Sequence, residues 1–264
     1  MNCYNCRRTL NKKTISKEHI PAQAFYVGYG NEFKKNRITV SACKICNENY
    51  SKTDQELRDS IGVTNDIDPL KKEYTRKSVS SILRKKGKNK LHFDISGRVI
   101  AVSFDYKDLK KSAIKDFKGL FCYKYKYPLP KEWKIEIVSS FETEIKPKIA
   151  ANYIEAYLHK DTEWSVSGHE DIFRYKLKTL VPNTESDISD TGDITNAISI
   201  ASIQEYHKKI GFLVIAARHK ELDIMRKKQK MKNLNKPNKK KDIVKQIQRT
   251  RSLKRQRNKT KRNI

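Results

Sequence analysis

Two cysteine pairs with the same short spacing constrain the fold of this chain more than any other feature of its sequence. Two residues separate the cysteines of each pair, and 36 residues separate the pairs, which are Cys3 with Cys6 and Cys43 with Cys46. Four thiolates with this spacing can surround one zinc ion tetrahedrally. Reduced thiols without a ligand, or iron in place of zinc, are the alternatives. Residues 1–58, which contain both pairs, are too few to form a large hydrophobic core. A bound metal ion would therefore supply much of the folding free energy of this segment.

The segment between the pairs carries an acid next to a histidine. Glu18 and His19 follow a short extended stretch, and a second extended stretch at residues 38–40 leads to the last cysteine pair. Asn47 comes directly after that pair, at the start of a helix that we expect to run to residue 57. The predicted order is therefore strand, loop, strand and helix. A carboxylate and an amide offer the oxygen ligands that Mg²⁺ prefers, and an imidazole with a pKa near ~6.5 can take a proton from water at neutral pH.

The N-terminal segment resembles the cysteine-rich branch of the HNH endonuclease family, in which zinc stabilises a ββα-metal fold. The resemblance covers residues 1–58 and rests on three motifs, Cys3-x-x-Cys6, Glu18-His19-Ile20-Pro21-Ala22 and Cys43-x-x-Cys46-Asn47. It implies that His19 is the general base that activates water. It also implies that Glu18 and Asn47 hold a catalytic divalent cation such as Mg²⁺, while the four cysteines hold a structural zinc ion.

The chain departs from the pattern of this family at two positions. Asn47 stands where the family often has a histidine. No asparagine on the second extended stretch matches the family residue that orients the base, and Asn36 and Thr39 are the nearest candidates for that role. A noncatalytic zinc ribbon that binds nucleic acid is the alternative function. Such a ribbon has no need of the acid, the histidine and the asparagine together.

The charge of the chain indicates a polyanionic partner. The net charge is +28, and residues 226–264 contain 18 lysines and arginines but only one acid. Such a tail cannot bury a core by itself, so we expect it to be disordered or to become helical on a polyanion. Nucleic acid is the expected partner, with double-stranded DNA as its expected form. Four basic side chains of the first segment are candidates for phosphate contacts, with a solvated basic face as the alternative: Arg7, Arg8, Lys12 and Lys13.

These features together predict a metal-dependent HNH-type endonuclease that hydrolyses phosphodiester bonds in DNA. A nuclease directed at RNA is a further alternative. The first ten residues lack the apolar core of a signal peptide, and the longest apolar run, at 210–217, is too short to span a membrane. We therefore expect a cytoplasmic protein.

The chain as a whole predicts an α+β fold in three parts. These are a zinc-bound nuclease module at residues 1–58, an α+β accessory domain at 59–225 and the basic tail at 226–264. Within the accessory domain, residues 91–104 have the alternation and turn signals of a hairpin. Apolar residues with helical spacing then predict one buried helix face, formed by Leu109, Ala113, Phe117 and Leu120.

A row of tyrosines follows this helix. Tyr123, Tyr125 and Tyr127 alternate with lysines, which predicts a strand whose tyrosines face the core. The same row is also typical of a surface on which nucleobases stack. We expect Cys122 to be a small buried side chain in this strand. Further strands are expected at 133–138 and 173–177, whereas the run at 210–217 is compatible with either a strand or a helix.

Overall fold

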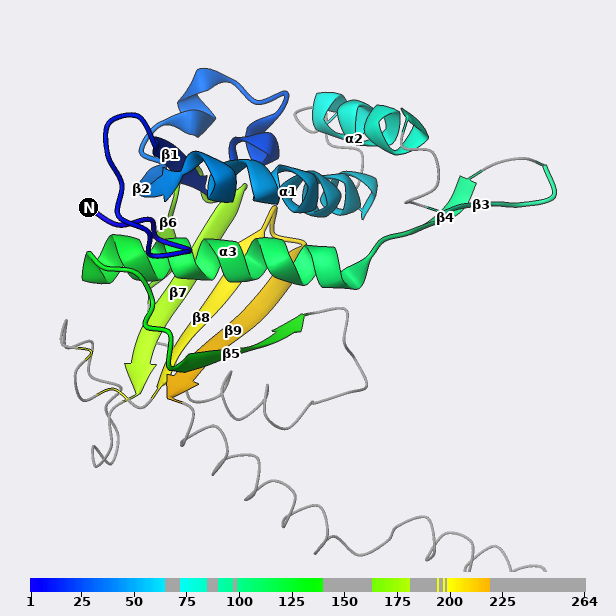
Figure 1. The fold of residues 1–264 in the computed structure, drawn as a ribbon. Coiled ribbons are helices and arrows are strands. Elements are labelled where there is room, and N and C mark those ends of the chain that lie inside the picture. The colour runs from blue at the N-terminus through cyan, green and yellow to red at the C-terminus, as the bar shows by residue number, and fades with distance from the viewer. Residues whose placement is uncertain are drawn as a thin grey trace, which may run out of the picture. The chain divides into compact units, whose positions relative to one another are not determined.

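The N-terminal hairpin runs directly into the first helix in the computed structural model of the chain (Figure 1). Strands β1 (Ile15–Ile20) and β2 (Ile38–Cys43) pair in antiparallel fashion, and α1 (Lys44–Thr64) begins at the next residue. Two short 3-10 helices lie in the connection between the strands, η1 (Gln23–Tyr26) and η2 (Asn31–Lys34). The predicted order of strand, loop, strand and helix is confirmed. Helix α1 continues beyond residue 57 because Leu57 and Ile61 are both buried in the core.

The structure describes most of the chain before its basic tail. The described residues are 1–64, 72–84, 90–96, 99–139, 163–180, 194, 197 and 199–218. The tail predicted at 226–264 lies outside them. The described ranges contain no helix that combines the length and the apolar character needed to cross a membrane.

A second helix packs on α1, and a hairpin follows it. Helix α2 (Lys72–Arg84) approaches α1 closely at Gly62, where a Cβ atom would lie only 2.1 Å from the hydroxyl oxygen of Ser78. The small glycine is therefore required for this helix contact. Strands β3 (Lys90–Phe93) and β4 (Val99–Ser103) then form an antiparallel pair, which confirms the predicted hairpin.

Helix α3 (Tyr106–Tyr125) lies at the centre of the fold. The Asp105 side chain caps its first turn by accepting a hydrogen bond from the backbone N–H of Lys107, and the helix ends at Lys126, which has a left-handed conformation with φ of 65°. The four apolar residues predicted to share one helix face are all buried, which confirms that prediction. The helix contacts α1, β1 and β2, and it also contacts β5 (Trp133–Ser139) and β9 (Ile210–Arg218) of a larger sheet.

The strand predicted for the tyrosine row is wrong. Tyr123 and Tyr125 belong to the last turns of α3, and Cys122 is a half-buried residue of the same helix. Residues two apart lie on nearly opposite sides of a helix, so Tyr125 is buried while Tyr123 is 44% exposed. The helix extends this far because Phe121 and Tyr125, four residues apart, continue its buried face.

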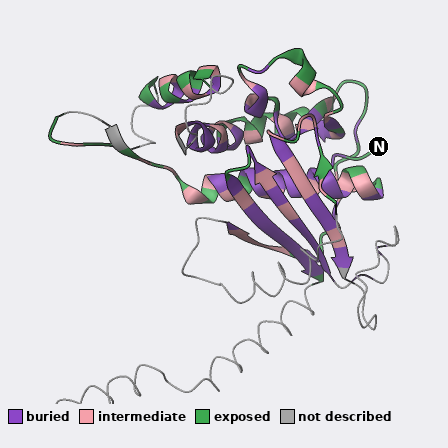
Figure 2. Ribbon diagram, turned by 180° about the vertical axis from the view of Figure 1, so that it is seen from behind, coloured by how far each residue is buried: buried purple, intermediate pink, exposed green. Residues whose placement is uncertain are grey.

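A five-stranded sheet forms the remaining described part of the fold. Its strands follow the spatial order β5-β9-β8-β7-β6, and every neighbouring pair is antiparallel. The strands are β5 (Trp133–Ser139), β6 (Ser165–Val166), β7 (Phe173–Leu180), β8 (Ser199–Tyr206) and β9 (Ile210–Arg218). The strands expected at 133–138 and 173–177 are confirmed, and the ambiguous run at 210–217 is a strand. Helix α3 lies across one face of this sheet in both views (Figures 1 and 2).

The hairpin, the helices and the sheet share one hydrophobic core. Ile20 of β1, Phe117 of α3 and Phe212 of β9 all belong to it, and the strands β8 and β9 are buried along most of their length (Figure 2). Gly119 of α3 brings β1 into close contact, because a Cβ atom there would lie 2.3 Å from Cδ1 of Ile20. The mixed α+β class predicted from the sequence is confirmed, and the cysteine-bearing hairpin is packed on the central helix.

Candidate metal centre and active site

The four paired cysteines come together where β2 meets α1. Their sulfur atoms all lie within 4.8 Å of one another, although Cys3 and Cys46 are 43 residues apart in sequence. Cys3 and Cys6 lie in the N-terminal loop, Cys43 ends β2, and Cys46 lies in the first turn of α1. The predicted clustering of these cysteines is confirmed.

The geometry of the cluster fits a tetrahedral metal ion. A Zn–S bond of ~2.3 Å implies sulfur atoms roughly 3.8 Å apart in a tetrahedral site. The sulfur atoms of Cys6 and Cys43 lie 3.8 Å apart. Burial raises the pKa of the Cys3 thiol, but hydrogen bonds from backbone N–H groups, including that of Cys43, outweigh burial and lower the pKa to about 7. The cluster could therefore hold a structural metal ion such as zinc.

Glu18 and His19 are neighbours in sequence, but their side chains lie on opposite faces of β1. Successive side chains of a strand alternate between its two faces. Glu18 is 3% exposed and lies opposite Val40 of β2, on the face that contacts α1 and α3. His19 is half-buried and lies opposite Thr39, which is exposed. The acid and the predicted base therefore meet different environments.

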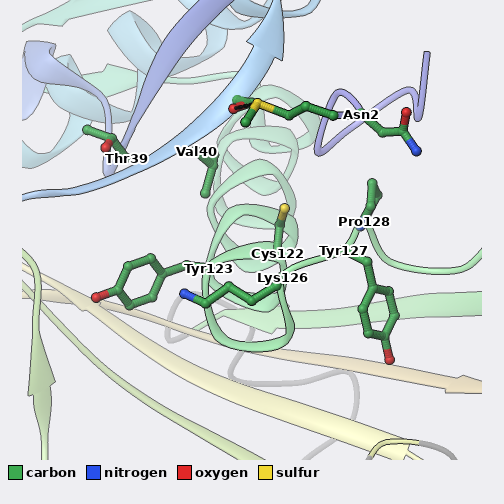
Figure 3. Close-up of a pocket in the computed structure, with 10 residues that line it drawn as sticks. Asn2, Thr39, Val40, Cys122, Tyr123, Lys126, Tyr127 and Pro128 are labelled. Atoms are coloured by element: carbon green, nitrogen blue, oxygen red, sulfur yellow. Dashed lines mark hydrogen bonds between the residues drawn. The ribbon is translucent and has the colours of Figure 1, made fainter. Parts of the chain in front are cut away.

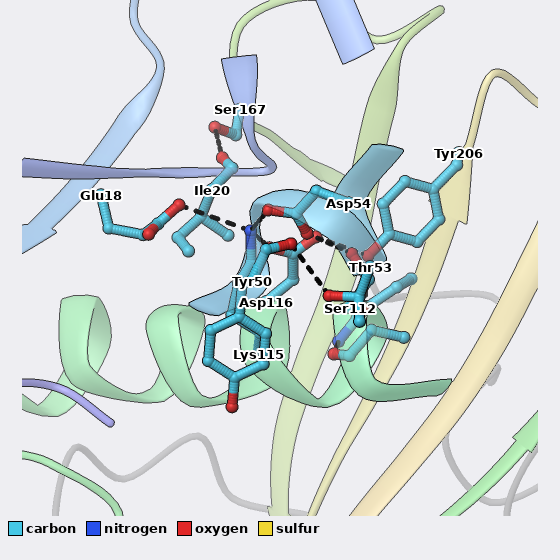
Figure 4. Close-up of polar contacts among 12 residues, drawn as sticks. Glu18, Ile20, Tyr50, Thr53, Asp54, Ser112, Lys115, Asp116, Ser167 and Tyr206 are labelled. Carbon is cyan, nitrogen blue, oxygen red and sulfur yellow. Dashed lines mark hydrogen bonds and ion pairs between the residues drawn. The ribbon is translucent and has the colours of Figure 1, made fainter. Parts of the chain in front are cut away.

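Glu18 belongs to a buried network of charges centred on Lys115 of α3 (Figure 4). The Nζ atom of Lys115 lies 3.4 Å from Oε1 of Glu18, 2.8 Å from Oδ2 of Asp54 and 3.3 Å from Oδ1 of Asp116. The lysine side chain is completely buried. Three carboxyl groups from β1, α1 and α3 thus surround a single ammonium group.

Hydroxyl groups extend this network toward the sheet. The Tyr206 hydroxyl of β8 donates a hydrogen bond of 2.7 Å to Oδ2 of Asp116, and the Ser112 hydroxyl donates one to Asp54. Gln204, two residues before the tyrosine, donates from its amide to the carbonyl oxygen of Ala113 at 3.1 Å. The polar network therefore joins the hairpin, two helices and the sheet through the middle of the core.

The charges of the network are not balanced. Burial raises the pKa of Glu18, and the positive charge of Lys115 only partly offsets this. Burial also raises the pKa of Asp116 to about 7. For Lys115, burial alone would lower the pKa, but the surrounding carboxylates outweigh it and raise that pKa. The lysine therefore stays charged at neutral pH, while Asp116 is partly protonated.

Sequence reasoning missed Lys115, Asp54 and Asp116. A signal was present in the sequence, because Lys115 and Asp116 interrupt a helix of strong apolar periodicity between Ala113 and Phe117. Lysine and aspartate are almost never fully buried unless they are paired. Their partners in α1 and β1 could not be identified without the tertiary structure.

His19 has the neutral protonation state that a general base requires. Burial lowers its pKa, and the positive charges of Arg37, Lys115 and Lys17 lower it further. The imidazole is therefore neutral at pH 7 and able to accept a proton. Its side chain makes no hydrogen bond with any of the described residues.

Asn47 lies close to the face of β1 that carries Glu18. Its Nδ2 donates a hydrogen bond of 2.8 Å to the hydroxyl oxygen of Ser16, which lies two residues before Glu18 on the same face. Outside the four cysteines, no group of three or more cysteine, histidine or acidic side chains in the described ranges could hold a metal ion. Asn47 of α1 therefore contacts the face of β1 that carries Glu18, and Glu18 itself is paired with Lys115.

The four basic candidates for phosphate contacts differ in their surroundings. Arg7 is half-buried, and its Nε donates a hydrogen bond of 2.7 Å to the carbonyl oxygen of Leu129, just after α3. Arg8, Lys12 and Lys13 are exposed. Arg7 therefore ties the cysteine loop to the end of α3, whereas the other three side chains are accessible to a ligand.

Comparison of the chain with protein-family models, with curated proteins and with solved structures finds no match.

Proposed function

We propose that the chain is a metal-dependent nuclease of the HNH type that hydrolyses phosphodiester bonds in DNA. The observation that carries the proposal is the placement of His19. A neutral imidazole without a hydrogen-bond partner among the described residues lies on the face of β1 opposite to Glu18, in a ββα unit that also carries the four-cysteine cluster. Hydrolysis of a phosphodiester needs a base for water and a counter-charge for the phosphate.

In this proposal each residue of the site has a separate task. His19 accepts the proton of the attacking water. Glu18 and Asn47 would hold a divalent cation, which offsets negative charge on the phosphate when it is bound. The atom of Glu18 suited to this is Oε2, because it has no hydrogen-bond partner among the described residues while Oε1 faces Lys115. The cysteine cluster fixes the start of α1 and thereby the position of Asn47.

A noncatalytic zinc-containing module that binds nucleic acid is the second candidate. The observation in its favour is the burial of Glu18 and its ion pair with Lys115. A carboxylate in that position has a structural role whether or not a cation is ever bound. The two candidates differ in whether His19 and Glu18 contribute to bond cleavage.

Cleavage assays with matched histidine variants test the proposal. Purified protein is incubated with supercoiled plasmid, linear duplex DNA and RNA, in the presence of Mg²⁺, Mn²⁺ or no added divalent cation. We expect metal-dependent cleavage of DNA, and a loss of about 100-fold or more in rate for His19→Ala. His92→Ala is the control, because His92 is an exposed histidine of the β3–β4 hairpin that bonds Ser103.

The result also decides between the candidates. Equal cleavage by the His19→Ala protein and the wild type would remove His19 from the mechanism. Binding of DNA without any cleavage, by protein that contains its full complement of zinc, would favour the noncatalytic module. Faster cleavage of RNA than of DNA would change the substrate but not the role of the base.

A further inference from the structure

A surface pocket lies beside β2, between the N-terminal residues and the end of α3 (Figure 3). Its floor includes the side chains of Val40 and Cys122. Its walls include Tyr123, Tyr127 and the aliphatic stem of Lys126. The two tyrosines lie on either side of the lysine in the close-up view. The pocket thus combines an apolar floor, aromatic rings and one positive charge.

The rings of this pocket are accessible. Tyr123 is 44% exposed and Tyr127 is 39% exposed, although large aromatic side chains contribute most when they are covered. The Nζ atom of Lys126 lies 4.6 Å from the centroid of the Tyr123 ring. A contact of this kind at an exposed site is weak, and the lysine side chain is flexible enough to move when another group stacks on the ring.

The pocket is continuous with the proposed catalytic face. Thr39 lines the pocket, and in the register of the hairpin it is the residue directly opposite His19. Residues opposite each other in an antiparallel pair have Cα atoms roughly 5 Å apart. Because Thr39 borders both places, a phosphate held near His19 would have its neighbouring nucleotide beside the pocket.

We propose that this pocket binds one unpaired nucleobase, which stacks on Tyr123 while Lys126 contacts a flanking phosphate. The inference rests on the proposed function, because it assigns a position on the substrate next to the bond that is cut. Every base has a flat π-face, so stacking of this kind tolerates all sequences. A base within an intact duplex cannot stack on a protein ring, so the preferred substrate contains a single-stranded or extruded nucleotide.

Binding of a fluorescent single strand tests the inference without any cleavage. The probe is a short DNA strand that contains 2-aminopurine, used free and in a duplex, with no divalent cation added and the zinc content of the protein checked. We expect stacking to change the 2-aminopurine fluorescence and the single strand to bind more tightly than the duplex. Tyr123→Ala should weaken binding of the single strand by about tenfold, whereas Tyr123→Phe should retain it.

Two further variants complete the experiment. Phe93→Ala removes an exposed aromatic ring from β3, outside the pocket, and should leave binding unchanged. Lys126→Ala should weaken binding and reduce the slope of log affinity against log salt by about 0.7. Equal binding by wild-type and Tyr123→Ala protein would overturn the inference. Unchanged 2-aminopurine fluorescence in the wild-type complex would also overturn it and would indicate contacts with the backbone alone.

Failure of the inference can be told apart from failure of the proposed function. If Tyr123→Ala loses binding but the wild-type protein cuts no nucleic acid, the pocket stands and the nuclease proposal fails. If the wild-type protein cuts DNA through His19 but Tyr123→Ala binds and cuts normally, the pocket assignment alone fails.

Discussion

Lys115 of α3 lies with its Nζ atom 3.4 Å from Oε1 of Glu18, although 97 positions separate the two residues in sequence. The contact joins the central helix to the first strand of the cysteine-bearing hairpin, and both side chains are buried. Two more carboxyl groups, those of Asp54 and Asp116, face the same ammonium group. The charge balance of this core therefore depends on a single lysine, and several expected results follow from it.

Removal of the Lys115 charge should destabilise the protein strongly. Lys115→Met keeps a long side chain but leaves three buried carboxyl groups without a counter-ion, which typically costs about 3–5 kcal/mol. Lys111→Met is the matched control on the same helix, because the Lys111 side chain is 60% exposed and a solvent-accessible ion pair such as the one it forms with Asp108 contributes at most about 1 kcal/mol. Urea unfolding measures both variants. Similar losses for the two would show that the buried network does not stabilise the fold.

The free energy of unfolding should fall as the pH rises from about 4 to about 7 and should level off above that. Burial raises the pKa of Asp116 to about 7, whereas an unfolded aspartate titrates near ~3.9. Between these two values the folded protein holds a proton that the unfolded chain has released, so each step up in pH favours the unfolded chain. The contribution is fully present at the lower value, and its loss is complete once the folded Asp116 has ionised.

Asp116→Asn should make this decline shallower, because the amide cannot ionise and can still accept the hydrogen bond of Tyr206. Asp108→Asn removes a carboxyl group of the same helix that lies outside the buried network, and it serves as the control. Urea unfolding at several values from about pH 5.5 to about pH 8 measures the slope. An unaltered slope in Asp116→Asn would assign the pH dependence to other groups.

Loss of one cluster cysteine should remove the metal and unfold the N-terminal segment. We expect elemental analysis to find about one zinc ion per wild-type chain and almost none in Cys43→Ser. The fifth cysteine provides the control, because Cys122 lies in α3 outside the cluster. Cys122→Ser should retain its zinc. A folded wild-type protein that contains no metal would refute a structural zinc site.

The contact between α3 and β1 should be sensitive to one methyl group. In Gly119→Ala, the new Cβ would lie 2.3 Å from Cδ1 and 2.5 Å from Cγ1 of the buried Ile20. Alanine favours a helix by about 1 kcal/mol over glycine, but overpacking of a rigid core costs about 1–3 kcal/mol. We expect a net loss of stability, which Ile20→Val should partly relieve in the double variant. Additive effects in a double-mutant cycle would contradict the close packing.

Replacement of Asn47 should change the metal dependence of the proposed activity. Asn47→Ala removes an oxygen ligand, so cleavage should fall at limiting Mg²⁺ and recover partly at high Mg²⁺. Asn47→His should retain more activity with Mn²⁺ than with Mg²⁺, because imidazole suits transition metals better. Asn49→Ala, two residues later on the exposed side of α1, serves as the control. If all three variants match the wild type with every metal, Asn47 has only a structural role at the helix start.

Local patterns were sufficient for several elements of the fold. The spacing of Cys3, Cys6, Cys43 and Cys46 predicted that the four thiols converge, because two short loops can each place two sulfur atoms on one ion. Periodicity predicted the buried face of α3 and the hairpin of β3 and β4. These predictions succeeded because each depends on residues only a few positions apart.

Local patterns gave a wrong prediction at the end of α3, where a strand-like alternation overlaps with a helical spacing of buried residues. Alternation of Tyr123, Tyr125 and Tyr127 with lysines favoured a strand, but Phe121 and Tyr125 continue the buried face of α3. Packing of that face against the core decides the conformation, since tertiary contacts override a short alternation. The helix leaves Tyr123 exposed at the pocket beside β2.

The environment of the predicted site was decided by tertiary structure alone. The sequence by itself determined that Glu18 and His19 are adjacent and therefore lie on opposite faces of any regular strand. Only the packing of α3 against that strand decided that Glu18 is buried beside Lys115, Asp54 and Asp116, while His19 on the other face is only half-buried. The physical reason is that burial and the nearest charge set the state of an ionisable group, and both depend on residues far away in sequence.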